Sequence, residues 1–588
     1  MSPELPDSFR RARRALEELQ PQIVAEDWIW DDSITCWCLA FQANLKAGNK
    51  LPSKTTWVAV VEDSYPDGFV RIFPSVDGGI EDTYPHQSNN GLEPHGKYCR
   101  SGRLCLFTEN TEWSIRGDAD FTLFSHMEKF LEWLNAANDC KLLKDGDRVE
   151  FPMQNIGSGE VVLYAEDEVS QMIWESHPAY LSGWLEMLES SPGLVCLSCF
   201  YGNDNCTVYS PVWGAAFVRN KKKKTHKGIW LIASSVPHIR NWQSPNTYGE
   251  LRIWARSEGI DLDEIVGQHS MDLRDGVRHY LAIGVACPDI VGGDARCLSW
   301  FVLKMPALSN GQEFGKSGVH KRDILKIVDK HKTFASNTRV DWVTSVNCSR
   351  DQLHSRGRLS EKLCESRIAL IGVGSLGSLV ANNLIRGGVT DLCVFDSDLF
   401  EIRNITRHLL AANNAGYAKA SSVSDVLNGI NPMAQVESRD ALGRGDEKLF
   451  KCFDIIIDCS SSLETLSLLD KSKGNRRLFV CSFGYAAERV YISSSTLDAF
   501  SVDEYYRAFE PLMSKDIKLM NSKGLPWEGT GCWSPVFPAK NSDISRAASI
   551  ITDCVDNFVS HNILDVKYAY EVKRDIDGLF EGIERIRL

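Results

Sequence analysis

The sequence predicts a multidomain protein that combines α/β and α+β folds, and three observations lead to this prediction. The chain has 588 residues, which is enough for about three or four domains of about 150 residues each. Along most of it, short apolar runs alternate with charged stretches whose apolar residues recur at helical spacing. Near residue 370, an apolar run enters a glycine-rich turn that is followed by a helical pattern. That order is typical of a strand, a tight turn and a helix that bind a phosphate.

The composition is that of an ordinary globular protein, and it excludes several classes. The 65 basic and 78 acidic residues give a net charge of −13, which argues against general nucleic-acid binding. The first residues, MSPELPDSFRRARR, contain no apolar signal core, and no run of about 18 apolar residues occurs. We therefore expect a cytoplasmic protein that binds proteins or small molecules, with no nucleic acid and no membrane. The 18 scattered cysteines are expected to be mostly reduced core residues.

Residues 1–160 predict the first domain, which we expect to be α+β. Asp7 or Ser8 is the expected N-cap of a helix that ends near Pro21. Two alternating apolar runs at 56–63 and 68–74 predict neighbouring strands. A second helix is predicted at 125–139, after a loop that contains Cys105.

The loop around Cys105 resembles the active-site loop of ubiquitin-conjugating enzymes. In that family a histidine stands ten positions before the catalytic cysteine, a glycine three before it, a leucine directly after it and a tryptophan eight beyond. The same positions here hold His95, Gly102, Leu106 and Trp113. The resemblance implies that Cys105 accepts an acyl group as a thioester and passes it to an amine.

Two points around this cysteine stay open. The family usually has Pro-Asn after its histidine, and the amide stabilises the oxyanion of the transfer step. Here Gly96 and Lys97 follow His95, so the sequence leaves the oxyanion donor unassigned. The alternative for Cys105 is a small apolar filler, which is what we expect of Cys99, since Cys99 lacks the surrounding pattern.

Residues 161–345 predict a linker and a further α/β domain without a glycine fingerprint. The turn-rich stretch KDGDRVEFPMQNIGSG marks the boundary before it. Apolar runs such as GIWLIASS, YLAIGVACP and SWFVLKMP then alternate with charged, helix-like stretches. The segment NGQEFGKSG is one residue short of a phosphate-binding loop and is followed by a polar segment, so we expect an ordinary loop. The run Lys221–Lys224 predicts a solvated hairpin tip.

Residues 346–588 predict the nucleotide-binding domain. The strand at 368–371 enters Gly372-x-Gly374-x-x-Gly377, where glycine lets the chain turn sharply and brings backbone N–H groups close to a phosphate. A second apolar run at 392–395 is followed by Asp396, whose carboxylate can accept ribose hydroxyls. By itself this unit also fits an NAD enzyme or a βαβ unit without a ligand.

Further polar residues follow in a recognisable order. Asp396-x-Asp398 is succeeded by Asn404-x-x-Arg407, Gly416-x-x-Lys419, Asn431-Pro432, and a strand that carries Asp454, Asp458 and Cys459. This set resembles the adenylating enzymes of the MoeB, ThiF and ubiquitin-activating family, whose motifs occur in the same order. Ordinary dehydrogenases share only the first two motifs, the glycine loop and the acidic residue after the second strand. The resemblance implies a Rossmann-like adenylation domain that uses ATP and Mg²⁺.

The resemblance also implies a role for each polar residue. Activation of a carboxylate brings two anions together, so positive groups must neutralise the triphosphate. Asp396 is expected to hold the ribose and Asp458 to lie near Mg²⁺, while the phosphate ligands are expected to be Asn404, Arg407 and Lys419. An upstream arginine of this family reaches the phosphates of the partner subunit. Its best match here is Arg350, with Arg356 and Arg358 as competitors.

Two cysteines near the C-terminus are expected to differ in role. Cys554 follows the apolar period of a helix that Asn541 or Ser542 is expected to cap, so we expect it in the core. Cys532 lies in a Gly- and Pro-bounded loop without apolar periodicity. Bacterial ThiF-like proteins fused to a conjugating domain carry a similar G-C-x-S-P-x-F segment. This resemblance implies that Cys532 is the activating nucleophile.

The order of the domains resembles the Cap2-type ubiquitin transferase-like proteins of CBASS anti-phage operons. That resemblance implies a ubiquitin-conjugating-like domain at 1–160, an inactive adenylation-like domain at 161–345 and an active one at 346–588. It implies an acyl-adenylate of a protein C-terminus, a thioester relay from Cys532 to Cys105, and transfer to a target lysine. The implied partners are a cyclic-nucleotide synthase (CD-NTase), activated at its C-terminal glycine, and a second copy of this chain in a homodimer.

Two other functions fit the same residues. The chain could conjugate a small ubiquitin-like protein in another bacterial pathway. It could also be a sulfur-carrier adenylyltransferase or a nucleotide-binding scaffold, in which case Cys105 is structural and there is no relay. Only the identity of the activated protein separates the first of these from the CBASS function.

Overall fold

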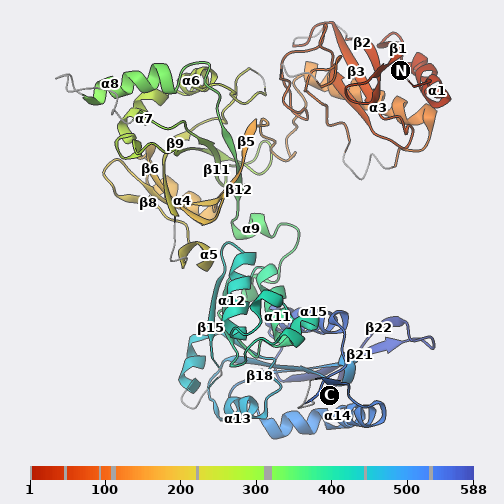
Figure 1. Cartoon of the computed structure of the whole chain (residues 1–588), viewed down its shortest axis with the longest axis vertical. Coiled ribbons are helices and arrows are strands. Elements are labelled where there is room, and N and C mark those ends of the chain that lie inside the picture. Colours follow the sequence, from red (N-terminus) through yellow and green to blue (C-terminus); the bar gives the residue numbers. More distant parts are fainter. Residues whose placement is uncertain are drawn as a thin grey trace. The chain divides into compact units, whose positions relative to one another are not determined.

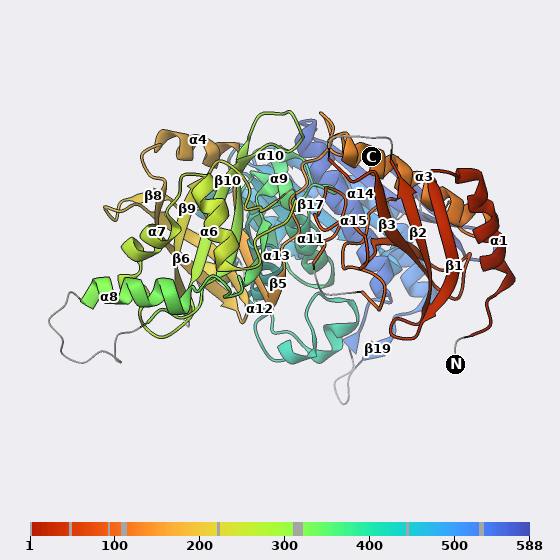
Figure 2. The same ribbon diagram turned by 90° about the horizontal axis from the view of Figure 1, so that it is seen from above.

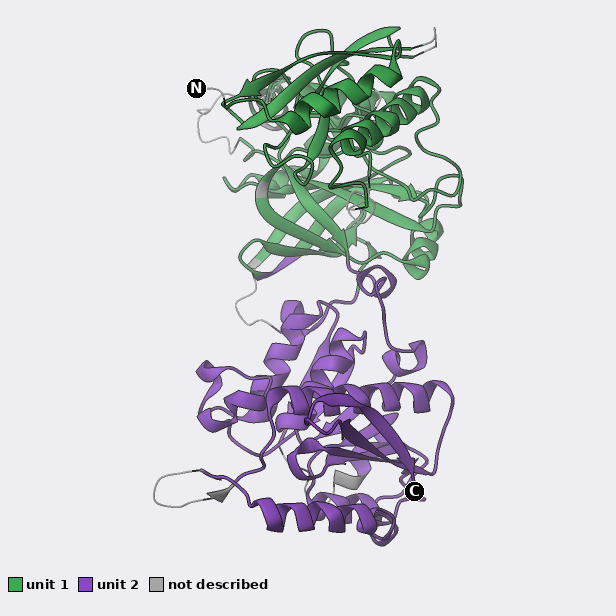
Figure 3. Cartoon of the chain, turned by 90° about the vertical axis from the view of Figure 1, so that its right-hand side faces the viewer, with its two compact units in different colours: residues 1–187, 191–211, 225–347 green, residues 188–190, 212–224, 348–588 purple. Residues whose placement is uncertain are grey.

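The computed structural model describes residues 3–45, 50–91, 95–107, 114–219, 224–240, 242–309, 321–440, 442, 446–528 and 534–588. The chain divides into two units, which Figure 3 shows in different colours. The first consists of residues 1–187, 191–211 and 225–347, and the second of 188–190, 212–224 and 348–588. Among the described residues, no helix combines the length and the apolar composition that a membrane crossing would need.

The N-terminal part of the first unit is an antiparallel sheet in the order β1-β2-β3-β4, covered by helices (Figures 1 and 2). Helix α1 packs against α3, and Arg11 on α1 forms an ion pair with Asp120 on α3 at 2.5 Å. The apolar residues of one sheet face and of both helices form one core. The elements are α1 (Asp7–Ala15), η1 (Leu16–Leu19), β1 (Ile23–Asp31), β2 (Cys36–Asn44), β3 (Lys54–Val61), β4 (Val70–Pro74) and α3 (Ala119–Asn138).

The expected strands at 56–63 and 68–74 are confirmed as the neighbours β3 and β4. The predicted N-cap of the first helix is wrong, because the helix begins at Asp7 and Pro6 precedes it without a side-chain cap. Proline fixes an extended approach, so Asp7 enters the first turn, where a carboxylate is favoured by the helix dipole. Helix α3 begins earlier than predicted, because the Asp118 carboxylate accepts hydrogen bonds from the N–H groups of Asp120 and Phe121.

The second part of the first unit is a mixed sheet in the order β5-β12-β11-β10-β9-β6-β7-β8, and β5 also pairs with β7. This extra pairing closes the sheet on itself. The elements are β5 (Ile156–Tyr164), α4 (Glu168–Ser176), β6 (Ser182–Ser191), β7 (Leu194–Tyr201), β8 (Thr207–Tyr209), β9 (Lys224–Ala233), α6 (Tyr248–Ser257), α7 (Leu262–His269), η2 (Met271–Leu273), β10 (Tyr280–Cys287), β11 (Cys297–Lys304), α8 (Lys321–Val328), η3 (Asp329–Thr333) and β12 (Trp342–Asn347).

Closure distinguishes this sheet from the open, doubly wound sheet of an adenylation-type domain, which is what the resemblance implied for 161–345. Its strands alternate between two cores: Tyr280 and Ala282 face one, while Leu281 and Ile283 face the other, beneath α6 and α7. The first core contains a buried carboxyl group, Glu166, which accepts hydrogen bonds from the indoles of two tryptophans, Trp174 and Trp300. Burial raises the pKa of Glu166 to about 7.

The main sheet of the second unit has the order β15-β14-β13-β16-β17-β18-β21-β22, in which the first five strands are parallel (Figure 1), and β19 and β20 form a separate two-stranded sheet. Helices α11, α12 and α15 cover one face, and α13 and α14 cover the other. The strands of this unit are β13 (Ile368–Ile371), β14 (Asp391–Phe395), β15 (Gln435–Arg439), β16 (Ile455–Asp458), β17 (Arg477–Phe483), β18 (Arg489–Thr496), β19 (Trp527–Glu528), β20 (Ser534–Pro535), β21 (Val566–Arg574) and β22 (Phe580–Arg587).

The helices of this unit are α5 (Ala215–Val218), α9 (Arg350–Leu353), α10 (Glu361–Cys364), α11 (Ser375–Arg386), η4 (Ile402–Arg407), η5 (Ala412–Asn414), α12 (Lys419–Ile430), η6 (Asp446–Cys452), α13 (Leu463–Lys471), η7 (Tyr485–Ala487), α14 (Val502–Lys523) and α15 (Asn541–Ser560). The expected core position of Cys554 is confirmed, since its side chain is buried. Neither Asn541 nor Ser542 is the N-cap of α15, because Lys540 precedes the helix and donates its N–H to the Asp543 carboxylate.

A segment between β8 and β9, residues 212–224, belongs to the second unit. The N–H of Gly214 donates to the carbonyl of Pro432, and that of Ala215 donates to the carbonyl of Ala434, both at 2.8 Å. A Cβ atom on Gly214 would lie 2.4 Å from the Ala434 carbonyl oxygen. Only glycine therefore allows this contact between two backbones.

We predict that Gly214→Val detaches this segment. The two backbone hydrogen bonds break, so the amides of residues 214 and 215 should exchange about 10- to 100-fold faster in hydrogen-exchange mass spectrometry. Gly159→Val is the matched control, because no atom lies within 4 Å of the added Cβ there. Unchanged protection in Gly214→Val would contradict the assignment.

Candidate functional site

The carboxyl ends of β13 and β16 form the centre of the second unit. Strand β13 pairs in parallel with β14 on one side and with β16 on the other, so the direction in which successive strands are added reverses at this point. In open parallel sheets, ligands bind in the crevice at such a reversal. The three predicted glycines lie at the end of β13 and the start of α11.

Each of the three glycines has a different reason to lack a side chain. Gly372 has φ +81°, and a Cβ there would lie 2.6 Å from the Cα of Ser460, at the end of β16. A Cβ on Gly377 would lie 1.9 Å from the carbonyl oxygen of Gly372. Gly374 faces open space at the N-terminus of α11, where backbone N–H groups are available to an anion. The first and third glycines therefore allow close packing, and the second leaves room for a ligand.

These elements enclose a pocket of about 930 Å³, which we call the nucleotide pocket. Its walls come from the glycine loop, the end of β14, the start of α12 and the segment from β16 to α13. The lining residues that the sequence predicted are Gly372, Gly374, Asp396 and Lys419. The residues that the sequence did not predict include Leu442, Ser460, Ser462, Thr465 and Leu468.

Asp396 and Lys419 are both held in place within this pocket. The Asp396 carboxylate accepts hydrogen bonds from the N–H groups of Val373 and Asp398, each at 2.9 Å. Burial raises the pKa of Asp396 above its ordinary value. The Lys419 ammonium forms an ion pair with the Asp398 carboxylate at 2.9 Å. One carboxylate and one cation thus line the same pocket, each held by its own partners.

His408 is hydrogen-bonded to the backbone of the glycine loop, and the sequence pattern did not predict this contact. Its Nε2 lies 2.8 Å from the carbonyl oxygen of Val373, and its Nδ1 accepts from the N–H of Leu410 at 3.1 Å. Burial lowers the pKa of His408 to about 4. The ring is therefore neutral at pH 7, with the proton on Nε2, where it donates to the loop.

Asn404 and Arg407 lie on η4 and are not among the residues that line the nucleotide pocket. The Asn404 side chain accepts a hydrogen bond from the N–H of Glu401 at 3.3 Å. The Arg407 guanidinium donates to the backbone carbonyl of Phe537. Both side chains thus already have hydrogen-bond partners in this structure, that of Asn404 within its own turn and that of Arg407 in the segment before α15.

Asp458 lies at the end of β16 and is fully buried. Its Oδ1 accepts hydrogen bonds from the N–H and the hydroxyl of Ser460, at 3.1 and 2.6 Å. Its Oδ2 is buried and has no hydrogen-bond partner among the described residues. Burial raises the pKa of Asp458 to about 6. Asp458 itself does not line the nucleotide pocket, but the next residues, Cys459 and Ser460, do. An unpartnered buried carboxylate oxygen next to these residues fits a divalent cation.

The first of the three candidate upstream arginines, Arg350, lies on the short helix α9, and Arg356 and Arg358 follow that helix. Arg350 forms an ion pair with Glu365 at 3.7 Å, and Arg358 with Asp351. Arg356 is exposed. None of the three lines the nucleotide pocket of its own chain.

The predicted conjugating cysteine, Cys105, lies on a loop between β4 and α3 that is tied to other segments. Cys105 is exposed, and its N–H donates to the carbonyl of His86 at 2.8 Å. A Cβ on Gly102 would lie 2.6 Å from the side-chain nitrogen of Gln87. The His95 ring stacks on Phe73 with the ring centres 4.6 Å apart. Cys99 is fully buried, as expected of a structural residue.

The thiol of Cys105 borders a pocket of about 270 Å³. Its lining includes three arginines and one histidine, namely Arg71, Arg103, Arg116 and His126. No carboxylate lines it among the described residues. The sequence did not predict this cationic surface, because its members come from separate parts of the chain.

Several predicted residues lie outside the described residues. They are Cys532, Trp113, most of the run Lys221–Lys224, and the residues from Gly311 to Ser317 of the NGQEFGKSG loop. The strands β19 and β20, which pair with each other, flank Cys532 in sequence.

Two parts of the chain match the models of known protein families. Residues 141–348 match the model of the Cap2 central linker domain, and residues 350–486 match that of the ThiF family. The second match contains the glycine loop, Asp396, Lys419 and Asp458. The expected ThiF-type adenylation fold is thereby confirmed.

The chain is also similar to individual proteins. The ATP-dependent ubiquitin transferase-like protein Cap2 of Enterobacter hormaechei is 26% identical over 89% of this chain and 90% of that protein. Ubiquitin-like modifier-activating enzyme 5 of Caenorhabditis elegans is 40% identical over 13% of this chain and 18% of that enzyme. The crystal structure of E. coli MccB with ATP, 18% identical, aligns with 39% of this chain and 65% of that one at a TM-score of 0.29.

The support that His408 gives to the glycine loop predicts a pH dependence of stability. Since the folded-state pKa is about 4 and the unfolded value about 6.5, the unfolded state takes up the proton first. The neutral His408 ring makes its full contribution to the free energy of unfolding above pH 6.5. That free energy falls by about 3 kcal/mol as the pH drops from 6.5 to 4. Calorimetric melting of wild type and His408→Gln should therefore converge over this range.

The control for this experiment is His561→Gln, because His561 is exposed at the end of α15. Its melting temperature should follow that of the wild type at every pH. A His408→Gln curve parallel to the wild-type curve from pH 4 to 7 would contradict the buried, neutral state of His408.

Proposed function

We propose that this chain, a ubiquitin-like activating transferase, links a protein C-terminus to a target lysine. The chain is a homologue of Cap2 and contains a Cap2 central linker domain and a ThiF-family domain. The reaction uses ATP and proceeds by adenylation, thioester relay and conjugation. The observation that carries this proposal is the convergence of Gly374, Asp396 and Lys419 on one pocket at the reversal of strand order.

Adenylation is the first step. A carboxylate oxygen of the protein C-terminus attacks the α-phosphorus of ATP, the new O–P bond forms, and the bond to the β-phosphate breaks, which releases pyrophosphate. Asp396 accepts the ribose hydroxyls, and the N-terminus of α11 and Lys419 stabilise the phosphate charge. Asn404 and Arg407 join these ligands if η4 releases its present contacts. The product is an acyl-adenylate.

The residues around Asp458 fit Mg²⁺, since its Oδ2 is buried without a partner. Asp458 would hold the ion, which supplies positive charge against the leaving pyrophosphate. Ser460 keeps the carboxylate oriented through Oδ1.

Thioester relay is the second step. The Cys532 sulfur attacks the acyl carbon and AMP leaves, and the Cys105 sulfur then attacks the thioester, so that the Cys532 thiolate leaves. The antiparallel sheet, the loop of Cys105 and helix α3 are the ubiquitin-conjugating-like domain of this proposal. The arginines beside Cys105, led by Arg71, whose guanidinium stacks 4.0 Å above the ring centre of Phe69, stabilise the oxyanion in place of the missing asparagine.

Conjugation is the third step, in which a lysine amine of the target attacks the Cys105 thioester and forms an isopeptide bond. The activated protein is the CD-NTase of a CBASS anti-phage system, and its C-terminal glycine supplies the carboxylate. The active form is a homodimer, in which Arg350 of one subunit reaches the phosphates bound by the other.

The fit of Asp458 to Mg²⁺ predicts a change in metal dependence. Asp458→Asn keeps the acceptor for Ser460 but removes the charge, so ATP–pyrophosphate exchange should fall about 100-fold and need more Mg²⁺ for half-maximal rate. Exchange is measured at a series of Mg²⁺ concentrations. The exposed Asp425 on α12 provides the control Asp425→Asn, which should behave like wild type. An unaltered Mg²⁺ curve in Asp458→Asn would remove Asp458 from the metal site.

The relay predicts which cysteines trap the acyl group. In Cys105→Ser and Cys532→Ser, each expressed with its operon partners, serine forms an oxyester that turns over more slowly than a thioester. Non-reducing gels and mass spectrometry should find the CD-NTase C-terminal peptide on each serine. The exposed Cys140 and Cys452 supply the controls Cys140→Ser and Cys452→Ser, which should carry no adduct.

Other results of the same experiment distinguish the alternatives. A small β-grasp protein on the two serines would show conjugation of a ubiquitin-like protein instead. If no adduct forms on either serine while ATP–pyrophosphate exchange persists, the relay is wrong and the chain is an adenylyltransferase without it.

A further inference from the structure

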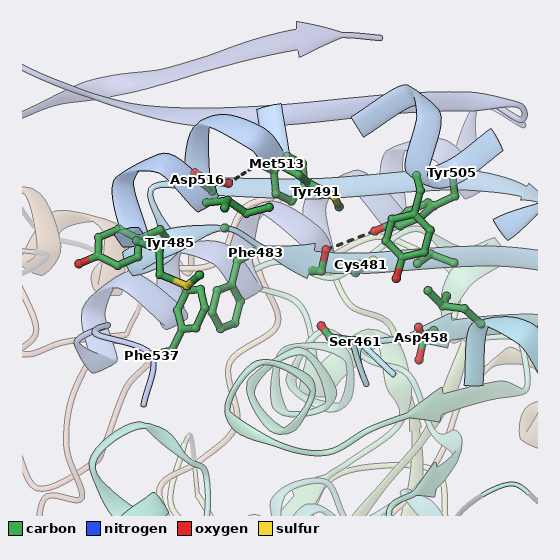
Figure 4. Close-up of a pocket in the computed structure, with 17 residues that line it drawn as sticks. Asp458, Ser461, Cys481, Phe483, Tyr485, Tyr491, Tyr505, Met513, Asp516 and Phe537 are labelled. Carbon is green, nitrogen blue, oxygen red and sulfur yellow. Dashed lines mark hydrogen bonds between the residues drawn. The ribbon is translucent and has the colours of Figure 1, made fainter. Parts of the chain in front are cut away.

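A second pocket adjoins the nucleotide pocket, and the proposed function has not used it. It has a volume of about 290 Å³ and lies between β17, β18 and α14 (Figure 4). We call it the aromatic pocket, because its lining includes Phe483, Tyr485, Tyr491, Tyr505, Tyr506 and Phe537. Met513, Ile517 and Met520 of α14 complete the wall.

The two pockets draw alternating residues from the stretch between the end of β16 and α13. Cys459, Ser460 and Ser462 line the nucleotide pocket, whereas Asp458 and Ser461 line the aromatic pocket. Figure 4 shows Asp458 and Ser461 at one side of the aromatic pocket. The segment 458–462 and the start of α13, where Leu466 lines the aromatic pocket and Thr465 the nucleotide pocket, therefore lie between the two pockets.

Most polar groups of the aromatic pocket already have hydrogen-bond partners, and an exception is the Asp458 Oδ2. Asp516 accepts hydrogen bonds from Tyr491 and Arg489. The hydroxyl of Tyr485 donates to the carbonyl of Gly524 at 3.0 Å, and the Ser482 and Tyr505 hydroxyls lie 3.3 Å apart. A nucleotide base would find few free donors or acceptors here, so the pocket suits an apolar group.

The size of the pocket agrees with one large apolar side chain. Its 290 Å³ is roughly twice the about 150 Å³ of an engineered apolar cavity that binds benzene. Ile517 is 51% and Tyr506 39% exposed, so the pocket opens to solvent at the side of α14. A side chain on an extended peptide can therefore enter it.

Phe537 connects this pocket to the predicted phosphate ligands. Its ring lines the pocket and packs against Phe483 with the ring centres 5.7 Å apart. Its backbone carbonyl accepts the hydrogen bond from Arg407. The same residue thus forms one wall of the aromatic pocket and fixes the arginine expected to hold a phosphate.

We infer that the aromatic pocket binds a large apolar side chain from the C-terminal segment of the protein that this enzyme activates. The inference rests on the proposed function, because adenylation brings the C-terminal carboxylate to the α-phosphate and therefore brings the residues before it past Asp458 and Ser461. The side chain anchors the segment in one register. The enzyme then selects its substrate by the residue that fills the pocket, in addition to the terminal carboxylate.

The test measures ATP–pyrophosphate exchange with synthetic peptides that end in glycine. Each position before the glycine carries alanine, aspartate, leucine or phenylalanine in turn. With the full-length wild-type enzyme, one position should prefer leucine or phenylalanine over alanine by about 10- to 100-fold in kcat/KM. The other positions should show no such preference.

Filling the pocket should remove this preference. Met513→Trp introduces an indole into the pocket, and the ratio at that position should fall below about 3-fold. Ile517→Trp does the same from the exposed rim, and so keeps the test valid if the first variant fails to fold. Lys518→Trp is the matched control, because Lys518 is exposed on α14 outside the pocket, and it should retain the wild-type preference.

Each other outcome overturns a distinct claim. Exchange that is equal for all peptides, or a preference that survives both pocket-filling variants, would overturn the aromatic pocket as a subsite and leave carboxylate activation intact. If no peptide supports exchange in the wild type, the proposed carboxylate activation fails, and the inference fails with it.

Discussion

The close approach of two backbones, those of Gly372 and Ser460, is the constraint on which the rest of the second unit depends. A side chain on Gly372 would overlap the Cα of Ser460, so the ends of β13 and β16 meet only if glycine is present. This contact creates the crevice between the glycine loop and the β16–α13 segment. Through Ser460 it also orients Asp458, so the nucleotide pocket and the candidate metal ligand arise from one packing requirement.

Hydrogen bonds from residues outside the glycine loop hold it in this position. His408 holds the loop through the carbonyl of Val373, and Asp396 holds it through the N–H of the same residue. Rigid, pre-oriented donors stabilise charge in a reaction without reorganising. The N-terminal loop follows the same principle, since the backbone of Cys105 is bonded to His86 while its thiol stays exposed.

Local sequence patterns predicted much of the second unit, and long-range contacts were the part that they could not predict. The glycines, Asp396 and the flanking strands follow from spacing within about 30 residues, because one βαβ unit positions them. His408, Phe537 and the arginines beside Cys105 act through contacts between distant segments, which no periodicity encodes. The closed sheet of the middle region was missed for a similar reason, since alternation defines two faces of a sheet and not whether its edges join. Asp7 and Asn541 were misassigned by one position, because helix ends depend on the residue that precedes them.

The placement of residues 212–224 has a consequence for the order of events during synthesis. This segment leaves the ribosome about 200 residues before Pro432 and Ala434, whose carbonyls accept its N–H groups. Domains generally fold from the N-terminus as the chain emerges, so β8 and β9 can pair with their neighbours while the loop between them has no partner. Residues 212–224 can therefore bind the second unit only after Pro432 and Ala434 have been translated. Until then they remain a loop between β8 and β9.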